Sequence, residues 1–316
     1  MRRRFDNFSI SLTSATSMTE LDWYTVPRPS RIGALFFYMR IFLRWLVYRN
    51  RSSFPYISGD AFVACADLQV TSLHILRKLS ELKLQQSGVI FIRGDLFNQF
   101  LAFHSNSLAP NVVLIIGNSD FNLTELPDAL SHKEFTLFAQ NSSINDQRVV
   151  PIPIGVENIK FGTHGRVRHL QKTFDFSERL VLFGPFGDTH PTRKKLTEIA
   201  LTMPDVFFVP PLRLSPHEYV RLSAGFKYVF CIRGNGVDTH RLWETLYRGQ
   251  VPIVIDCEWS KQISAIFPQI IRIKDFSDLQ ILLPRLDFIG SDFIPEVIPQ
   301  LWMPYWLEKV SLARLN

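Results

Sequence analysis

Short apolar runs alternate with amphipathic stretches along most of the chain from residue 55 onwards. The apolar runs predict buried strands at residues 89–92, 112–116, 135–139, 149–154, 180–183, 206–209, 228–232, 251–255 and 270–273. Apolar residues at helical spacing predict helices at residues 67–84, 96–103, 192–202, 215–224, 239–248, 259–267 and 277–286. Because strands and helices that alternate in this way favour parallel sheets covered by helices, we expect an α/β fold.

The alternation divides into two parts. The polar and basic stretch ahead of the second part contains two glycines and predicts a linker at 161–178. We therefore expect a first lobe at 55–160 and a second lobe at 179–295. The second lobe has the element order of a doubly wound, Rossmann-like domain, although it lacks the GxGxxG fingerprint. A further helix is expected within 296–316.

The most informative crossover follows the apolar strand at 228–232. A turn with two glycines occupies 233–236, and a helix then runs to about Tyr247. Asp238 and Thr239 offer side-chain oxygens that could cap this helix. The segment up to the next strand is long enough for a parallel crossover, which points its first turn and helix start at a ligand.

This turn has the chemistry of a phosphate site. Free backbone N–H groups and the helix dipole favour an anion at a helix N-terminus. Arg233 and Arg241 add fixed positive charge beside the turn. The segment 184–196 is a second candidate, because Thr192 and Arg193 could reach a phosphate, or it could be an ordinary loop with a helix cap. We interpret the crossover as the diphosphate site of a nucleotide-sugar enzyme.

Residues 233–256 also resemble a known family. The run RGNGVDTHRLWETLYRGQVPIVID is similar to the donor-side signature of exostosin-type glycosyltransferases, in particular their bacterial and viral members. A weaker match is PIPIGVEN at 151–158. Shorter similar segments occur at 57–60, 89–95 and 115–120. The resemblance therefore extends over roughly residues 56–275, most closely in the last third.

The resemblance implies a GT-B fold, in which two Rossmann-like lobes face a central cleft. The second lobe would bind a nucleotide-sugar donor, the first lobe would bind a glycan or lipid-linked acceptor, and the C-terminal helix would pack back on the first lobe. The reaction would be an inverting glycosyl transfer. The donor-binding residues would be Arg193, Arg233, Gly234, Asn235, Gly236, Asp238, Thr239, His240, Arg241 and Glu244.

Glu244 is open to two interpretations. It could hydrogen-bond a ribose diol of the donor, which is the role that the resemblance favours. It could instead form a local ion pair with Arg241 or Arg248, worth a few tenths of a kcal/mol on an exposed helix. Trp243 and Tyr247 are neighbours one helical turn apart, and we expect both in the core.

Four carboxylates are candidates for the base that takes the proton of the acceptor hydroxyl. Asp60, Asp95 and Asp120 each follow the end of an expected strand, where open α/β sheets place ligand groups. Glu157, beside the expected linker, is the fourth. Each aspartate could equally cap the next helix or turn, and Glu157 could make a hinge contact. We favour Asp120, because its strand is the most apolar of the three.

The sequence contains no Asp-x-Asp motif, with which GT-A glycosyltransferases commonly hold a divalent metal. Its absence agrees with a metal-independent mechanism, in which helix N–H groups and arginines neutralise the departing diphosphate. We therefore expect no metal and no cofactor. The absence of GxxxxGK[ST] excludes a P-loop kinase.

Composition narrows the function classes further. A chain of 316 residues with 27 phenylalanines is long and apolar enough for two folded domains. The net charge of +6 fits anionic nucleotides, an anionic membrane, nucleic acid or simply a basic surface. No specific nucleic acid is expected, because the basic residues are dispersed without a recognition motif. A basic nucleic-acid-binding protein and a catalytically inactive GT-B scaffold are the alternatives to an active enzyme.

Residues 1–54 are expected to form a basic arm and an amphipathic helix. Arg40 and Arg44 interrupt the apolar block at 33–48, and at ~1.5 Å per residue its helix is shorter than the ~30 Å hydrocarbon core. Its alternatives, in order of preference, are a helix packed on the enzyme, an interfacial helix and a membrane span. The sequence has three cysteines without CxxC spacing and no signal-peptide cleavage site, which favours a cytoplasmic protein. If the helix at 33–48 is interfacial, the protein would also contact the inner membrane face peripherally.

Overall fold

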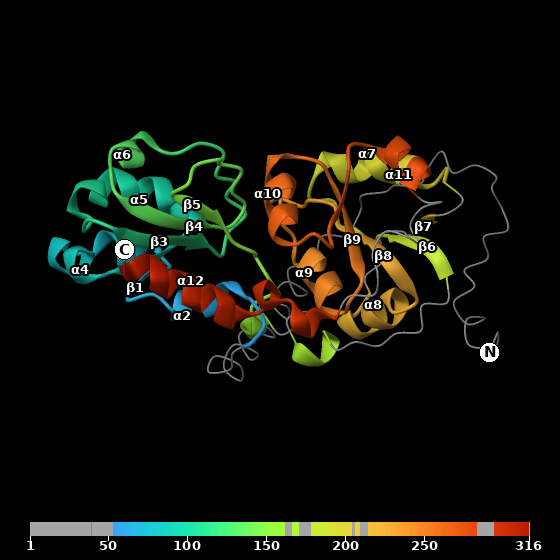
Figure 1. Ribbon diagram of the computed structural model, residues 1–316, viewed down its shortest axis with the longest axis horizontal. Coiled ribbons are helices and arrows are strands. Elements are labelled where there is room, and N and C mark those ends of the chain that lie inside the picture. The colour runs from blue at the N-terminus through green and yellow to red at the C-terminus, as the bar shows by residue number, and fades with distance from the viewer. Residues whose placement is uncertain are drawn as a thin grey trace.

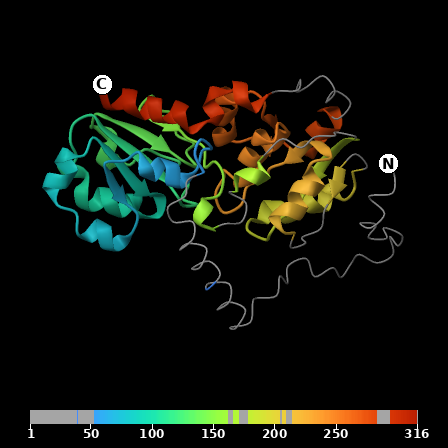
Figure 2. The same cartoon turned by 90° about the horizontal axis from the view of Figure 1, so that it is seen from below.

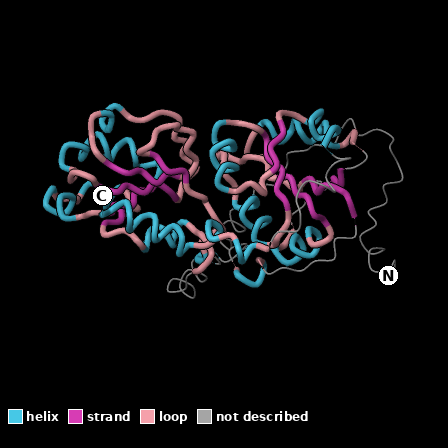
Figure 3. The backbone as a smooth tube through the Cα atoms, in the orientation of Figure 1, coloured by secondary structure: helices cyan, strands magenta, loops and turns pink. Residues whose placement is uncertain are grey.

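The chain forms two α/β lobes that lie side by side (Figure 1). The computed structural model describes residues 39, 53–161, 166–170, 178–203, 206–208, 214–282 and 294–315. Within these residues, each lobe is built on one five-stranded sheet in which every strand pairs in parallel. Helices flank the strands of both sheets (Figure 3). The predicted α/β class is confirmed, and the arrangement is compatible with two Rossmann-like lobes.

The sheet of the first lobe follows the order of the chain. Its strands are β1 (Leu68–Val70), β2 (Val89–Arg93), β3 (Val112–Gly117), β4 (Phe135–Ala139) and β5 (Val149–Pro151). Because right-handed crossovers that all advance in one direction leave their helices on one face, the connecting helices share a side of the sheet. These helices are α3 (Leu73–Arg77), α4 (Glu81–Gln86), α5 (Phe97–His104) and α6 (Asp128–Ser131).

The opposite face of this sheet is covered by segments from the two ends of the described chain. Helix α2 (Gly59–Ala64) precedes the first strand, and helix α12 (Met303–Leu315) returns from the second lobe. Successive side chains of a strand point to opposite faces of the sheet. On this face, alternate residues of β2 and β3 pack against α2 and α12 in one buried cluster, which includes Val89, Phe91, Val113, Ile115, Phe62, Trp306 and Val310. Figure 2 shows α12 on the side of the sheet away from α4 and α5.

The second lobe has the doubly wound order β10 (Ile271–Ile273), β9 (Val251–Ile255), β8 (Phe226–Phe230), β6 (Glu178–Phe183) and β7 (Val206–Phe208). The direction of winding reverses between β6 and β8, which makes these neighbouring strands the topological switch point. One face packs on α7 (Pro191–Ala200) and α11 (Phe276–Leu282). The other packs on α8 (Pro216–Ser223), α9 (His240–Tyr247) and α10 (Glu258–Ile266).

A single buried side chain joins both lobes and the C-terminal segment. The Tyr247 hydroxyl of α9 accepts a hydrogen bond from the Ile57 N–H (3.0 Å) and donates one to the Leu301 carbonyl (2.5 Å). The rings of Tyr56 and Trp302 lie 4.9 Å and 5.6 Å from the Tyr247 ring. As expected, Tyr247 is buried in the core.

The prediction of one helix over 67–84 is wrong. The structure has strand β1 followed by the two short helices α3 and α4. The Ser72 and Ser80 hydroxyls accept hydrogen bonds from the backbone N–H groups of Ile75 and Lys83, so each short helix begins at its own cap. The apolar spacing fits a helix, but the pairing of Leu68–Val70 with β2 determines the outcome.

The apolar block at 33–48, for which a helix packed on the enzyme is the preferred expectation, lies outside the described residues, apart from Met39. Among the residues that the structure does describe, no helix combines the length and apolar character needed to cross a bilayer.

The packing of α12 leads to a stability prediction. Trp306 is 1% exposed, its ring lies 6.5 Å from that of Phe62, and its indole N–H donates to the Gln300 carbonyl (2.9 Å). Trp306→Ala should lower the free energy of unfolding by about 3–5 kcal/mol, because it opens a cavity against the first sheet. Leu312→Ala, on the exposed side of the same helix, should change it by less than about 0.5 kcal/mol. Urea unfolding of both variants is the measurement. Equal effects would show that Trp306 of α12 does not pack against the first sheet.

Candidate functional site

Two loops leave the switch point of the second lobe side by side. One follows β6, and the other follows β8 and leads into α9. Carboxyl ends of neighbouring strands at a switch point are where open α/β sheets bind ligands. At Gly234 an added Cβ would lie 3.2 Å from both Arg193 Nη2 and Thr189 Oγ1. The glycine therefore allows the two loops to pack closely.

Arg193 of α7 holds the two loops together. It donates hydrogen bonds to the carbonyls of Arg233 (2.9 Å), Ile232 (3.1 Å) and Gly187 (3.0 Å). Burial, followed by the nearby charge of Arg241, lowers the pKa of Arg193 to about 10. Among the described residues, this guanidinium has carbonyl acceptors but no carboxylate partner.

Arg241 approaches the same loops from the first turn of α9. Its guanidinium donates to the Pro185 carbonyl (2.7 Å) and lies over the ring of Phe186 (4.5 Å), which Arg193 also contacts (5.2 Å). Within the described ranges, neither these two arginines nor Arg233 forms an ion pair with a carboxylate. The loops thus carry concentrated positive charge that the described residues do not neutralise.

Two donors in this cluster are buried without a hydrogen-bond partner. They are Nε of Arg233 and Nη1 of Arg241. Buried donors normally find an acceptor, and an orphaned one at a cleft points to a missing ligand, water or ion. Together with the uncompensated charge, this arrangement suits an anion such as a phosphate group.

A cavity of about 470 Å³ lies between the lobes beside Arg233. The second lobe contributes Arg233 and Thr192, the apolar Val254, and Glu258 and Trp259 from the start of α10. The first lobe contributes only amide and hydroxyl side chains, namely Asn122, Thr124, Asn141 and Ser143. The volume is in the range of small-molecule sites, which are concave and mostly apolar with a few placed polar groups.

Asp238 connects the loop between β8 and α9 to the first lobe. This loop contains the turn at 233–236, called the donor-side turn after its predicted role. Its carboxylate accepts hydrogen bonds from the Ile154 N–H (2.8 Å) and the Trp243 indole (2.8 Å), and its own N–H donates to Asn141 Oδ1 (2.9 Å). Asp238 is 3% exposed, so it faces the interlobe contact and not the cavity. The prediction of a Thr239 side-chain cap is wrong, because Thr239 is the N-cap residue but its hydroxyl makes no cap bond.

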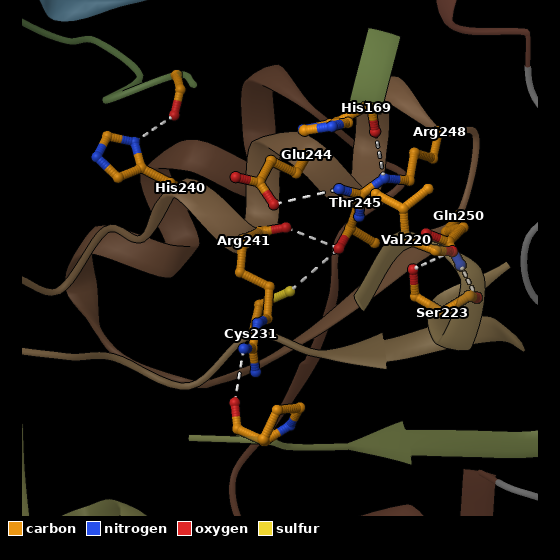
Figure 4. Close-up of polar contacts among 12 residues, drawn as sticks. His169, Val220, Ser223, Cys231, His240, Arg241, Glu244, Thr245, Arg248 and Gln250 are labelled. Carbon is orange, nitrogen blue, oxygen red and sulfur yellow. Dashed lines mark hydrogen bonds and ion pairs between the residues drawn. The ribbon is translucent and has the colours of Figure 1, made fainter. Parts of the chain in front are cut away.

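Other members of the predicted donor set also contact the first lobe. His240 shares a hydrogen bond between its Nδ1 and the Gly155 carbonyl (2.8 Å), and Figure 4 shows it leaving α9 in a different direction from Arg241. A Cβ at Gly236 would lie 3.0 Å from Asn141 Oδ1, so only glycine fits there without displacement. The turn is therefore fixed against the first lobe at several points.

Glu244 is buried, and the local ion pair is the role that the structure shows. Its carboxylate lies 3.2 Å from Arg248 Nη2, and the two side chains are 5% and 3% exposed (Figure 4). Arg248 also donates from Nε to the carbonyl of the buried His169 (3.0 Å). Trp243 is fully buried, as expected.

The four candidate bases lie in different surroundings. Asp60 is paired with Lys160 (2.9 Å), and Asp95 with Arg93. Glu157 is half-buried. Asp120 is exposed and accepts a hydrogen bond from Asn235 Nδ2 of the donor-side turn (3.2 Å). Asp120 thus lies at the junction where the first lobe meets the predicted diphosphate site.

Comparison with protein-family models and with curated proteins finds no match for this chain. Among the residues that can be described, no group of histidine, cysteine and acidic side chains is arranged to hold a metal ion.

Sequence reasoning missed several cavity residues. Glu258 and Trp259 follow β9, whereas Asn122 and Ser143 follow β3 and β4. A signal existed, because all four lie just beyond strand ends, where ligands bind in open sheets. The sequence alone did not show which strand ends of the two lobes face each other.

Burial of Asp238 predicts a pH dependence of stability. Desolvation raises its pKa from 3.8 to about 7, although three hydrogen bonds favour the charged form. The folded protein therefore holds this proton more tightly than the unfolded chain. The resulting stabilisation is complete below about pH 4 and is lost as the pH rises to about 7. Asparagine resembles the protonated acid and does not titrate, so the wild type should lose stability relative to Asp238→Asn as the pH rises from 4 to 8. Unfolding free energies of both proteins across this range are the measurement. A pH-independent difference would contradict the assignment.

The buried ion pair gives a second prediction. Glu244→Ala should lower the free energy of unfolding by about 3–5 kcal/mol, because it leaves the buried Arg248 guanidinium uncompensated. Glu258→Ala is the matched control, since that carboxylate pairs with Lys261 at the surface and should contribute less than about 1 kcal/mol. Chemical denaturation separates the two cases. A fully stable Glu244→Ala variant would favour the ribose-binding role instead.

Proposed function

We propose that the protein is a glycosyltransferase of GT-B architecture that transfers a sugar from a nucleotide-sugar donor to a hydroxyl group of a glycan or glycolipid. The observation that carries the proposal is the arginine cluster at the β6–β8 switch point. Arg193, Arg233 and Arg241 meet there without a carboxylate partner among the described residues, and two of their buried donors lack acceptors. Of the three arginines, Arg233 lines the cavity between the lobes.

The charge of the cluster suits the diphosphate of such a donor. When the acceptor oxygen bonds to the anomeric carbon, the bond from that carbon to the phosphate oxygen breaks, and its electron pair stays on the diphosphate. Fixed positive groups stabilise this growing charge without reorganisation. The arginines can supply this stabilisation without a metal, and the resemblance to exostosin-type enzymes supports the same location for the donor.

Asp120 is the best-placed candidate for the base. Its carboxylate is exposed and contacts Asn235 of the donor-side turn, and the residue lies two positions before Asn122, which lines the cavity. In an inverting transfer it would take the acceptor proton as the new glycosidic bond forms. By contrast, Asp60 and Asp95 are each engaged by a basic side chain of their own lobe.

The phosphate assignment predicts how nucleotides bind. UDP or GDP should bind in the presence of excess EDTA, and Arg233→Ala should weaken binding by about 10- to 100-fold, as expected for a charge-assisted hydrogen bond. Arg233 lines the cavity, so its loss should not unfold the protein. Arg221→Ala removes an exposed arginine of α8 that does not line the cavity, and this control should bind normally. Isothermal titration calorimetry measures all three proteins.

Other outcomes would separate the alternative functions. Strict dependence of binding on magnesium or manganese would overturn the metal-independent mechanism. Nucleotide binding without sugar transfer to any acceptor would favour an inactive scaffold. Failure to bind nucleotides, together with salt-sensitive binding of DNA or RNA, would favour a nucleic-acid-binding protein.

A further inference from the structure

Two loops of the first lobe form a ledge on one side of the interlobe cavity. The ledge consists of residues 122–124, which follow β3, and residues 141–143, which follow β4. A parallel bridge joins Leu123 to Ser142. The Leu123 N–H donates to the Asn141 carbonyl (3.1 Å), and the Ser143 N–H donates to the Leu123 carbonyl (3.0 Å). The two short segments therefore behave locally like paired strands.

Alternation along the segment 122–124 explains which of its side chains reach the cavity, whereas Asn141 lies in a turn with a left-handed backbone (φ 51°). Successive side chains of an extended segment point to opposite sides. Leu123 and Ser142 point into the lobe and are 3% and 0% exposed. Their chain neighbours Asn122, Thr124, Asn141 and Ser143 are the four first-lobe residues that line the cavity. The bridge thus presents two amides and two hydroxyls together.

The ledge is polar but carries no charge. Asn141 uses its amide internally, donating to the Ser119 carbonyl (3.2 Å) and accepting from Asp238. Asn122 uses only its oxygen, which accepts the Val237 N–H (3.3 Å), so its amide N–H groups can meet a ligand. The charged residues that line the cavity, Arg233 and Glu258, both come from the second lobe.

We propose that this ledge selects an uncharged, hydroxyl-bearing sugar as the transferred group and disfavours a sugar that carries a carboxylate. The proposal rests on the proposed function, which places the diphosphate at Arg233. The sugar attached beyond it then extends toward the first lobe. Amide and hydroxyl side chains pair well with sugar hydroxyls, but they do not neutralise a carboxylate that is removed from water.

A comparison of matched ligands tests the proposal. We would measure the affinities of UDP, UDP-glucose and UDP-glucuronic acid, and of GDP, GDP-mannose and GDP-mannuronic acid, by isothermal titration calorimetry. In the series whose nucleoside diphosphate binds, the neutral sugar nucleotide should bind at least about tenfold more tightly than the uronate. A uronate that binds as tightly as its neutral counterpart, or more tightly, would overturn the proposal.

A charge-introducing variant tests the role of the ledge itself. Thr124→Lys places a cation on the cavity wall and should raise the affinity for the uronate about tenfold more than it raises the affinity for the neutral sugar nucleotide. Glu125→Gln is the matched control, because it makes the same change in net charge one residue along the loop at a side chain that does not line the cavity. It should not alter the preference. Equal effects of the two variants would mean that the ledge does not contact the sugar.

The two levels of the argument fail in different ways. If neither nucleoside diphosphate nor any sugar nucleotide binds, the proposed function is wrong and the ledge proposal falls with it. If the nucleoside diphosphate binds and Arg233→Ala weakens it, but neutral sugar and uronate are not distinguished, the proposed function stands and only the ledge proposal is wrong.

Discussion

The structure depends on the need to cover the second face of the first sheet. Its strands follow chain order, so all of the connecting helices lie on one face, and the other would expose residues such as Phe91 and Ile115. Helix α12 covers part of this second face, and the chain must return from the second lobe to place it there. The Tyr247 hydroxyl, bonded to Ile57 and Leu301, fixes the point of return. Because Tyr247 ends α9, whose first turn carries Arg241, the same contact also relates the arginine cluster to the first lobe.

Helix α9 contains two arginines in contrasting surroundings. Arg248 is buried with Glu244 as its counter-charge, as expected of a structural group, because a buried charge without a partner is costly. Arg241 has carbonyl and aromatic contacts but no acidic partner among the described residues. Each arginine has one buried donor without a partner, so the counter-charge is what differs between them. The difference between the two residues is therefore what distinguishes the candidate ligand site from the core.

Local patterns predicted the elements of the second lobe well. The predicted strand at 251–255 matches β9 residue for residue, and the helix that ends at Tyr247 was located to within one residue at its start. Contacts between segments that are distant in the sequence could not be predicted in this way. Leu68–Val70 has a spacing that suits a helix, yet it pairs with β2. The partner of Glu244 and the burial of Asp238 depend equally on contacts between distant segments, as does the cavity wall. Sequence could therefore locate the arginine turn but not the ledge that faces it.

Asp238 shows why an acid can occupy a buried junction where no catalytic role is required. Three donors converge on its carboxylate, from Ile154, Trp243 and Thr239. An asparagine offers one acceptor oxygen, so it would leave at least one of these donors poorly satisfied. The carboxylate can satisfy all three, and these bonds lower its pKa, but desolvation outweighs them and raises the pKa to about 7. Because Ile154 belongs to the first lobe and Trp243 to the second, the acceptor geometry of one residue holds the donor-side turn against the ledge. The hydrogen bonds of this one residue therefore help to set the spacing between the arginine turn and the ledge.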